Sequence, residues 1–320
     1  MDRETLENSQ PLLFKGLERG FKEGLLPQAI LLYGSPRCRF REIARFIGQS
    51  FACTSEGLAC GECSSCRRFL SGIHPDYVEI EGGDSNIRKE QIEKLREFFS
   101  MEAVENSTRR RGYSIIDCQR MTEEAANSLL KFLEEPSPSV TAILTAPTLE
   151  AVLPTIVSRC EPIRLNPRPR EEIYEFLRER YSPEVAYFLS SFSGDDERLL
   201  EAAESEDFLL ASGAATDFIR SLDRGHLEAS YTLLLASQTC QGHPRCYNHF
   251  YRNLSRFLAD ALAQDGLFGP FSREIKLFGR DDSDLASRME LSLRENWSMS
   301  RANLSFIGVL AQLSLLLATG

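Results

Sequence analysis

The sequence predicts an α/β fold, with a doubly wound parallel sheet in the first half of the chain and helices throughout the second half. Apolar runs of strand length are spaced along the first half, at residues 29–34 (AILLYG), 77–80, 113–117 and 141–145. Helical patterns alternate with them, at residues 12–27, 40–51 and 122–133. This alternation favours parallel strands covered by helices on both faces, with ligands bound beyond the carboxyl ends of the strands.

The sequence pattern changes near residues 166–169 (NPRP), since from Arg170 onward no run has convincing strand character. Short helical patterns there predict a small helical lid, and longer patterns predict a separate all-α domain. The expected parts are therefore an α/β domain with a cysteine-rich insertion at about 53–66, a lid and a helical C-terminal domain, over residues 1–166, 167–209 and 210–320.

The composition is that of a soluble globular protein, with 42% hydrophobic and 26% charged residues. No apolar run reaches the roughly 18 residues of a membrane span, and residues 1–10 lack the apolar core of a signal peptide. We therefore expect a cytoplasmic protein without a membrane partner. The net charge of −10 argues against non-specific coating of nucleic acid, because neutralising phosphates requires cations.

Four clustered cysteines predict one structural Zn²⁺ site, with Cys53, Cys60, Cys63 and Cys66 as its ligands. Two of their intervals are CxxC steps, in which a tight turn aims two sulfurs at one ion. No histidine or carboxylate is placed to act on a metal-bound water, so the expected role is structural. In a cytoplasmic chain the nine cysteines are expected to be metal ligands or buried thiols and not disulfides.

A second group of possible ligands recurs every three residues, at Cys240, His243, Cys246 and His249. Gly242 and Pro244 interrupt the segment, so a helix does not align the four side chains. The sequence leaves open whether they bind metal or are core and surface residues of the helical domain.

The turn after the first predicted strand stands where a phosphate-binding P-loop belongs. A working loop reads GxxxxGK[ST]. Its glycines let backbone N–H groups reach the phosphates, its Lys binds the phosphates, and its Ser/Thr hydroxyl binds Mg²⁺. Here Gly34 is followed by Arg39, Phe40 and Arg41 at the glycine, lysine and hydroxyl positions. We therefore expect no functional ATP site.

The run at residues 113–117 stands where a Walker B acid pair belongs. The first acid would assist Mg²⁺ and the second would polarise the attacking water. Asp117 keeps the first acid, whereas Cys118 replaces the second. Two independent parts of a hydrolytic site are thus missing.

Arg159, in the segment 154–160 (PTIVSRC), is the candidate for a catalytic residue that acts on another subunit. A guanidinium inserted into a neighbour's ATP site stabilises charge on the transferred phosphoryl group. The competing interpretation is a solvated arginine near a helix end.

Taken in order, these features resemble the bacterial clamp-loader family of AAA+ proteins, over residues 28–165. The most specific stretch is 125–136 (AANSLLKFLEEP), and His74-Pro75-Asp76 also fits. In that family the gamma/tau subunits are ATPases, whereas delta-prime subunits carry the zinc module and a degraded loop. The residues at 39–41 and 118 place this chain on the delta-prime side. Thr145 and Arg198 match the sensor 1 and sensor 2 regions and receive no role.

The resemblance implies a non-hydrolysing AAA+ module whose Arg159 serves ATP on an adjacent gamma/tau subunit. It also implies a hetero-pentamer with gamma/tau and delta subunits, in which the C-terminal helices form a collar. The assembly would load the sliding clamp onto primed DNA, as part of the DNA-directed DNA polymerase III holoenzyme at the bacterial nucleoid.

Two other functions remain as alternatives: an active gamma/tau-type ATPase, or a regulator that binds DNA through the zinc module. The sequence does not decide the role of six arginines. Residues 37, 39 and 41, with Arg109, Arg110 and Arg111, can be phosphate ligands, solvated loop charges or a DNA-facing patch.

Overall fold

The computed structural model describes residues 1–55, 57–72, 76–82, 86–100, 111–134, 140–300 and 306–319. The chain divides into two compact units, Met1–Arg168 and Pro169–Gly320. The division of the second unit into a lid and a collar stays a prediction.

The first unit contains one five-stranded sheet in which all neighbouring strands are parallel. The strands lie in the order β2 (Tyr77–Glu81), β3 (Arg111–Ile116), β4 (Val140–Ala146), β1 (Ala29–Tyr33) and β5 (Glu161–Arg164). The expected α/β class is confirmed, because crossover connections join parallel strands throughout this sheet.

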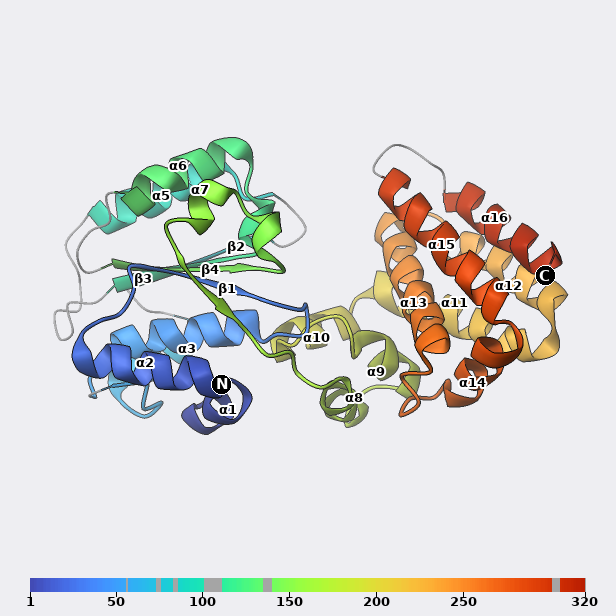
Figure 1. Ribbon diagram of the computed structural model, residues 1–320, viewed down its shortest axis with the longest axis horizontal. Coiled ribbons are helices and arrows are strands. Elements are labelled where there is room, and N and C mark those ends of the chain that lie inside the picture. The colour runs from blue at the N-terminus through green and yellow to red at the C-terminus, as the bar shows by residue number, and fades with distance from the viewer. Residues whose placement is uncertain are drawn as a thin grey trace. The chain divides into compact units, whose positions relative to one another are not determined.

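The sheet is covered on both faces, as its buried strands require (Figure 1). On one face lie α1 (Arg3–Ser9), α2 (Pro11–Glu23), α3 (Phe40–Ala52) and the short α4 (Ser64–Leu70). On the other lie α5 (Lys89–Ser100), α6 (Glu123–Glu134) and α7 (Pro154–Val157). Two short 3-10 turns, η1 (Cys118–Arg120) and η2 (Leu149–Ala151), follow β3 and β4. Each face has its own cluster of buried apolar side chains.

The edge strand β5 was not predicted from the sequence. Its four residues read EPIR, and all but the half-buried Ile163 are exposed. Pro162 has no N–H to donate, which a strand tolerates at the edge of a sheet. The strand is held by its register against β1, in which Ile30 pairs with Glu161 and Leu32 with Ile163.

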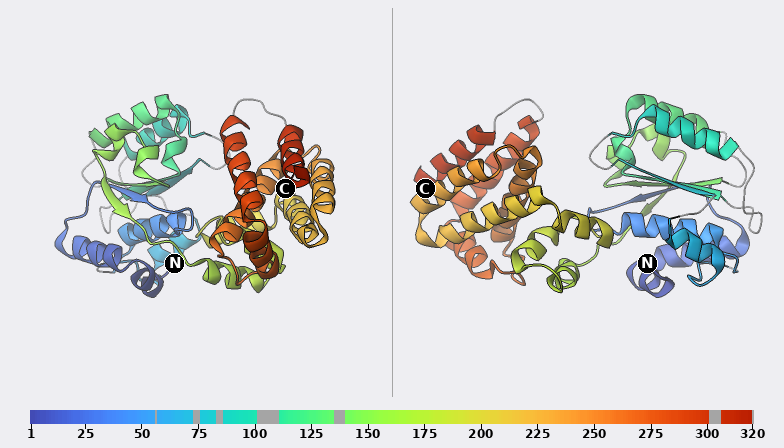
Figure 2. Two further views of the ribbon diagram at one scale, coloured as in Figure 1. Left: turned by 45° about the vertical axis from the view of Figure 1, so that its right-hand side comes forward. Right: turned by 180° about the vertical axis from the view of Figure 1, so that it is seen from behind.

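Every regular element among the described residues of the second unit is a helix. The first three are α8 (Arg170–Arg178), α9 (Pro183–Leu189) and α10 (Asp196–Ala203). The others are α11 (Glu206–Ser221), η3 (Leu222–Arg224), α12 (His226–Thr239), α13 (Pro244–Ala263), α14 (Ser272–Asp281), α15 (Ser283–Ser300) and α16 (Phe306–Thr319). One hydrophobic cluster runs from Ile173 to Leu317, and Figure 2 shows these helices from two further sides.

A charged network is buried inside this helical unit. The Arg170 guanidinium donates from Nη1 and Nη2 to the two oxygens of Asp260, at 2.8 and 2.9 Å. The Tyr187 hydroxyl donates to Oδ2 of Asp260, and Arg256 forms a further ion pair with Oδ1. Burial, followed by the charge of Asp260, raises the pKa of Tyr187. The network ties α8, α9 and α13 together.

Within the described ranges, no helix combines the length and apolar composition needed to span a bilayer.

Candidate functional site

The four clustered cysteines converge in space as their spacing predicts. Their sulfur atoms all lie within 4.8 Å of one another, with 3.6 Å between Cys53 and Cys60 and 4.0 Å between Cys60 and Cys66. A tetrahedron with Zn–S bonds of about 2.3 Å has edges of about 3.8 Å. The cluster can therefore hold one metal ion.

The local fold places the sulfurs by helix ends and tight turns. Cys53 follows the last residue of α3, and Cys63 is the N-cap of α4, where its sulfur accepts from the Cys66 N–H at 3.3 Å. The Cys60 sulfur accepts from the Cys63 N–H at 3.4 Å. Gly61 adopts φ +77°, a left-handed conformation that glycine tolerates best, and so allows the turn between them.

Hydrogen bonds favour the thiolate form that binds metal at two of the four sulfurs, Cys60 and Cys63, whereas burial raises the pKa of the Cys66 thiol. At Cys63, burial opposes ionisation, but hydrogen bonds from the backbone of Thr54 and Cys66 lower the pKa to about 5. At Cys60, hydrogen bonds from the Ser55 side chain and from backbone N–H groups lower the pKa. Four sulfur donors at these distances fit Zn²⁺ better than Mg²⁺ or Ca²⁺, which prefer oxygen.

The second candidate group does not converge. Cys240 and Cys246 form a disulfide, so the expectation that no cysteine is oxidised is wrong for this pair. The turn between α12 and α13 brings their Cα atoms to 5.4 Å, within the range that a disulfide bridges. His243 contacts Asp207 at 2.8 Å, and His249 packs edge-on against the Phe208 ring.

The loop after β1 is occupied by contacts within the chain. Phe40, at the lysine position, is 5% exposed and belongs to the core beneath α3. Arg39 pairs with Glu42 at 2.8 Å. Arg41, at the hydroxyl position, contacts Glu79 and Glu81 of β2 at 2.8 and 2.5 Å.

The same loop closes against the segment that follows β5. The Cys38 thiol donates to the Leu165 carbonyl at 3.5 Å, and Arg37 donates from Nη1 to the Arg168 carbonyl at 2.8 Å. A Cβ added to Gly34 would lie 2.9 Å from the Cys38 sulfur and 3.0 Å from the Leu165 oxygen. In a working loop the space beside such a glycine is filled by phosphate, whereas here it is filled by the Cys38 sulfur and the Leu165 carbonyl.

The end of β3 keeps one acid and buries a thiol. Asp117 has φ +59°, and its N–H donates to the Thr145 hydroxyl of β4 at 3.0 Å. Cys118 is 1% exposed, and burial followed by the nearby charges of Cys160 and Asp117 raises the pKa of its thiol. A neutral, buried thiol does not polarise water as a carboxylate does.

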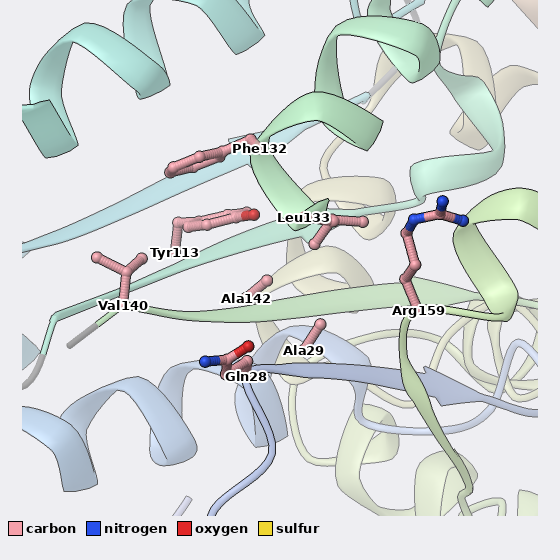
Figure 3. Close-up of a pocket in the computed structure, with 8 residues that line it drawn as sticks. All are labelled: Gln28, Ala29, Tyr113, Phe132, Leu133, Val140, Ala142 and Arg159. Carbon is pink, nitrogen blue, oxygen red and sulfur yellow. The ribbon is translucent and has the colours of Figure 1, made fainter. Parts of the chain in front are cut away.

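Arg159 lies at the amino ends of the parallel strands, whereas the loop after β1 lies at their carboxyl ends. It shares the lining of a small cavity of about 30 Å³ with Gln28 and Ala29, at the start of β1 (Figure 3). Gly34 follows β1 six residues after Gln28, which corresponds to about 20 Å along a strand at about 3.3 Å per residue. Arg159 therefore cannot reach the loop of its own chain.

The side chain of Arg159 is 35% exposed. Its Nη2 contacts Oε1 of Glu134 at 2.6 Å, and its Nη1 donates to the Thr155 carbonyl at 2.9 Å and to the Ser158 hydroxyl at 3.4 Å. The structure thus presents this arginine at the surface in a defined orientation.

Arg111 is neither a solvated loop charge nor part of a DNA-facing patch. It is 6% exposed, pairs with Asp76 at 3.3 Å and donates to the carbonyls of Phe98 and Phe99 at the end of α5. Sequence reasoning missed this role because the pairing joins distant segments. Arg109, Arg110, His74, Pro75 and residues 135–136 lie outside the described residues.

Comparisons with known proteins extend these observations. The model of the family described as "DNA polymerase III, delta subunit" matches residues 9–169. The DNA polymerase III delta-prime subunit of Bacillus subtilis is 32% identical over 201 residues, 62% of this chain and 60% of that protein. The delta-prime subunit of Haemophilus influenzae is 31% identical over 198 residues, 60% of this chain and 59% of that protein.

Among solved structures, a gamma subunit-related protein of Thermotoga maritima aligns with 94% of this chain and 97% of its own length, at 17% identity and a TM-score of 0.46. The match to the two delta-prime relatives spans about 60% of their length. Since the family model covers half of the residues, the chain belongs to the DNA polymerase III delta-subunit family, and the resemblance to its delta-prime members in the AAA+ clamp-loader group is confirmed.

Proposed function

We propose that this chain is a delta-prime-type clamp-loader subunit that does not hydrolyse ATP and lends Arg159 to ATP bound on a neighbour. The neighbour is a gamma/tau subunit, in a hetero-pentamer that also contains a delta subunit. The assembly loads the sliding clamp onto primed DNA during replication, in the bacterial cytoplasm at the nucleoid. DNA is contacted as part of this complex.

The observation that carries the proposal is the separation of Arg159 from the loop after β1. The loop lies at the carboxyl ends of the strands, whereas Arg159 lies at their amino ends beside Gln28. An arginine in that position can serve only a nucleotide held by another molecule. Its planar guanidinium suits a phosphoryl group, since it donates several parallel hydrogen bonds.

The contacts of the loop support the absence of ATPase chemistry in this chain. A buried Phe40 offers a phosphate no charge, and Arg41, held by Glu79 and Glu81, places a cation where a working loop has the hydroxyl that binds Mg²⁺. Cys118 removes the acid that would activate water. An active gamma/tau-type motor would need a lysine at position 40, a hydroxyl at position 41 and an acid at position 118.

For the four-cysteine cluster we propose one structural Zn²⁺, held by Cys53, Cys60, Cys63 and Cys66. A bound Zn²⁺ would stabilise the module by cross-linking the end of α3 to α4. Four protein sulfurs complete a tetrahedral site, so no position remains for water or substrate. The ion is thus a part of the fold and not of the reaction.

Reconstitution with gamma/tau and delta subunits tests the proposal. The measurement is clamp- and DNA-stimulated ATPase of complexes that carry Arg159→Ala, with assembly checked by gel filtration. We expect intact assembly and a loss of stimulated rate of more than about ten-fold, because arginine fingers contribute about 10³–10⁵ in rate at the site that they serve.

Two variants sharpen this test. Arg159→Lys keeps the charge but loses the fork of donors, and it should recover only part of the rate. Arg19→Ala removes another surface arginine that is paired with a carboxylate, Glu23, and should leave the rate unchanged. A wild-type rate in Arg159→Ala, or ATP hydrolysis by the isolated chain, contradicts the proposal.

A further inference from the structure

We infer that Glu134 is a positioning residue for Arg159, holding its guanidinium in the orientation in which it meets the neighbour's nucleotide. The inference rests on the proposed function and adds a second residue to it. Glu134 is the last residue of α6 and lies 25 positions before Arg159 in the sequence. Its carboxylate meets the guanidinium at 2.6 Å, a shorter distance than those from the guanidinium to the Thr155 carbonyl and the Ser158 hydroxyl.

Both side chains project from anchored backbone. Phe132, two residues before Glu134, stacks on Tyr113 of β3 with ring centroids 5.2 Å apart. Ile156 and Cys160, on either side of Arg159, are 1% and 8% exposed and belong to the same core cluster as Phe132 and Tyr113. In Figure 3, Leu133 lies between Tyr113 and Arg159. The pair thus joins two fixed points of the fold and does not link two mobile surfaces.

The donor count shows that Glu134 holds the guanidinium without blocking it. An arginine has five N–H donors. Two on Nη1 go to the Thr155 carbonyl and the Ser158 hydroxyl, and one on Nη2 goes to Glu134. Within the part of the chain that the structure describes, the N–H on Nε and the second N–H on Nη2 have no acceptor, so they remain for phosphate oxygens. Glu134 and phosphate can therefore bind the same guanidinium together.

Stability does not explain the pair. The side chains are 35% and 51% exposed, and ion pairs between exposed side chains contribute little to folding because water screens them. Fixing the orientation of a long side chain before the reaction, in contrast, removes a cost that the neighbour's site would otherwise bear. The pairing is therefore of use to catalysis in the complex and of little use to the chain alone.

The test compares Glu134→Ala and Glu134→Gln in the reconstituted complex with gamma/tau and delta subunits. At saturating ATP we expect Glu134→Ala to lower the clamp- and DNA-stimulated rate about three- to ten-fold, since mispositioned groups lose much of their effect. Glu134→Gln keeps an oxygen that accepts from Nη2, so its loss should be smaller. Glu93→Ala removes a surface carboxylate paired with Lys89 at 3.1 Å and should match the wild-type rate.

A double-mutant cycle isolates the positioning role from other effects. If Glu134 acts through Arg159, Glu134→Ala should change nothing further in a complex that already carries Arg159→Ala. A further loss in that background, a wild-type or higher rate in Glu134→Ala alone, or failure of Glu134→Ala to assemble overturns the inference. If Arg159→Ala itself has no effect, the proposed function fails instead, so the two failures are distinguishable.

Discussion

The guanidinium of Arg41 bridges two carboxylates of β2, with its Nε 2.8 Å from Oε1 of Glu79 and its Nη2 2.5 Å from Oε2 of Glu81. Arg45, one turn along α3, joins the same Glu79 carboxylate at 3.0 Å. At the position where a P-loop helix offers a hydroxyl to Mg²⁺, this chain therefore carries a cation that is neutralised by its own sheet. These ion pairs tie the start of α3 to β2.

These contacts predict a stabilising role for Arg41. Its side chain and that of Glu79 are only 14% and 16% exposed, so water screens the pair weakly. Arg41→Ser takes a cation away from two partly buried carboxylates, of which Glu79 keeps its contact with Arg45. We expect the free energy of unfolding of the chain to fall by about 2 kcal/mol, the usual size of a lost hydrogen bond to a charged group. Urea unfolding followed by circular dichroism measures it.

Arg19→Ala is the matched control for this variant. The Arg19 side chain is 76% exposed and pairs with Glu23 on the surface of α2. Its loss should change the stability by no more than about 0.5 kcal/mol. Equal effects of the two substitutions would show that the network around Arg41 is solvated and does not fix the helix.

Restoring lysine at the P-loop position should not restore ATP binding. Phe40 is packed in the core beneath α3, so Phe40→Lys removes an aromatic ring from the core and sets an ammonium group in its place. We expect destabilisation of about 3 kcal/mol or more, as for other truncations of buried aromatic side chains. Phe40→Leu, which keeps an apolar side chain, should cost less. Calorimetric titration with Mg·ATP should detect no binding to either variant, and binding to Phe40→Lys would contradict this view of the loop.

Much of the first unit follows from short-range patterns in the sequence. Apolar runs marked β1, β2, β3 and β4, because buried parallel strands need apolar side chains on both faces. The cysteine spacing marked a site that the turns then close. Departures from the P-loop pattern were equally visible, since the loop is contiguous in sequence.

Features that depend on distant segments could not be predicted in this way. The strand β5 has a polar sequence and exists because β1 offers it an edge. Arg111 is buried because Asp76 and the end of α5 surround it. The Cys240–Cys246 disulfide depends on how the turn between two helices folds. In each case the partner was known only once the chain had folded.

The four-cysteine cluster predicts a stability that depends on metal. Cys60→Ser removes one of four sulfurs, so the bound zinc measured by mass spectrometry should fall from about one per chain to a small fraction. A ligand at 100 times its dissociation constant stabilises the folded state by about 2.7 kcal/mol, and the variant should lose an effect of about this size. A strong chelator should destabilise the wild-type chain similarly.

Cys38→Ser separates this effect from the general cost of changing a buried cysteine. Cys38 is fully buried but belongs to the loop after β1, where a serine hydroxyl can still donate to the Leu165 carbonyl. This variant should keep its zinc. Full zinc content in Cys60→Ser would remove the cluster from consideration as a metal site.

The buried network of the second unit predicts a large penalty at Asp260. Its carboxylate is fully buried, and it receives both terminal nitrogens of Arg170 as well as the Tyr187 hydroxyl. Asp260→Asn keeps the shape but removes the charge, which leaves the buried Arg170 guanidinium with its longer contact of 3.4 Å to the exposed Asp265 as its counter-ion. Breaking such a pair costs about 3–5 kcal/mol, so thermal unfolding of the variant should begin at a clearly lower temperature.

Asp284→Asn provides the comparison within the same unit, because that aspartate is 88% exposed and pairs with Arg288 one turn along α15. Its effect should stay within about 0.5 kcal/mol. If both substitutions cost the same, the Asp260 charge is reached by water. A large difference instead means that α8, which begins at Arg170, is bound to α13 by charge as well as by apolar packing. Because Leu258 and Ala261, beside Asp260 on α13, belong to the hydrophobic cluster that runs through the unit, loss of the Asp260 charge should then unfold α8 and α13 in one transition.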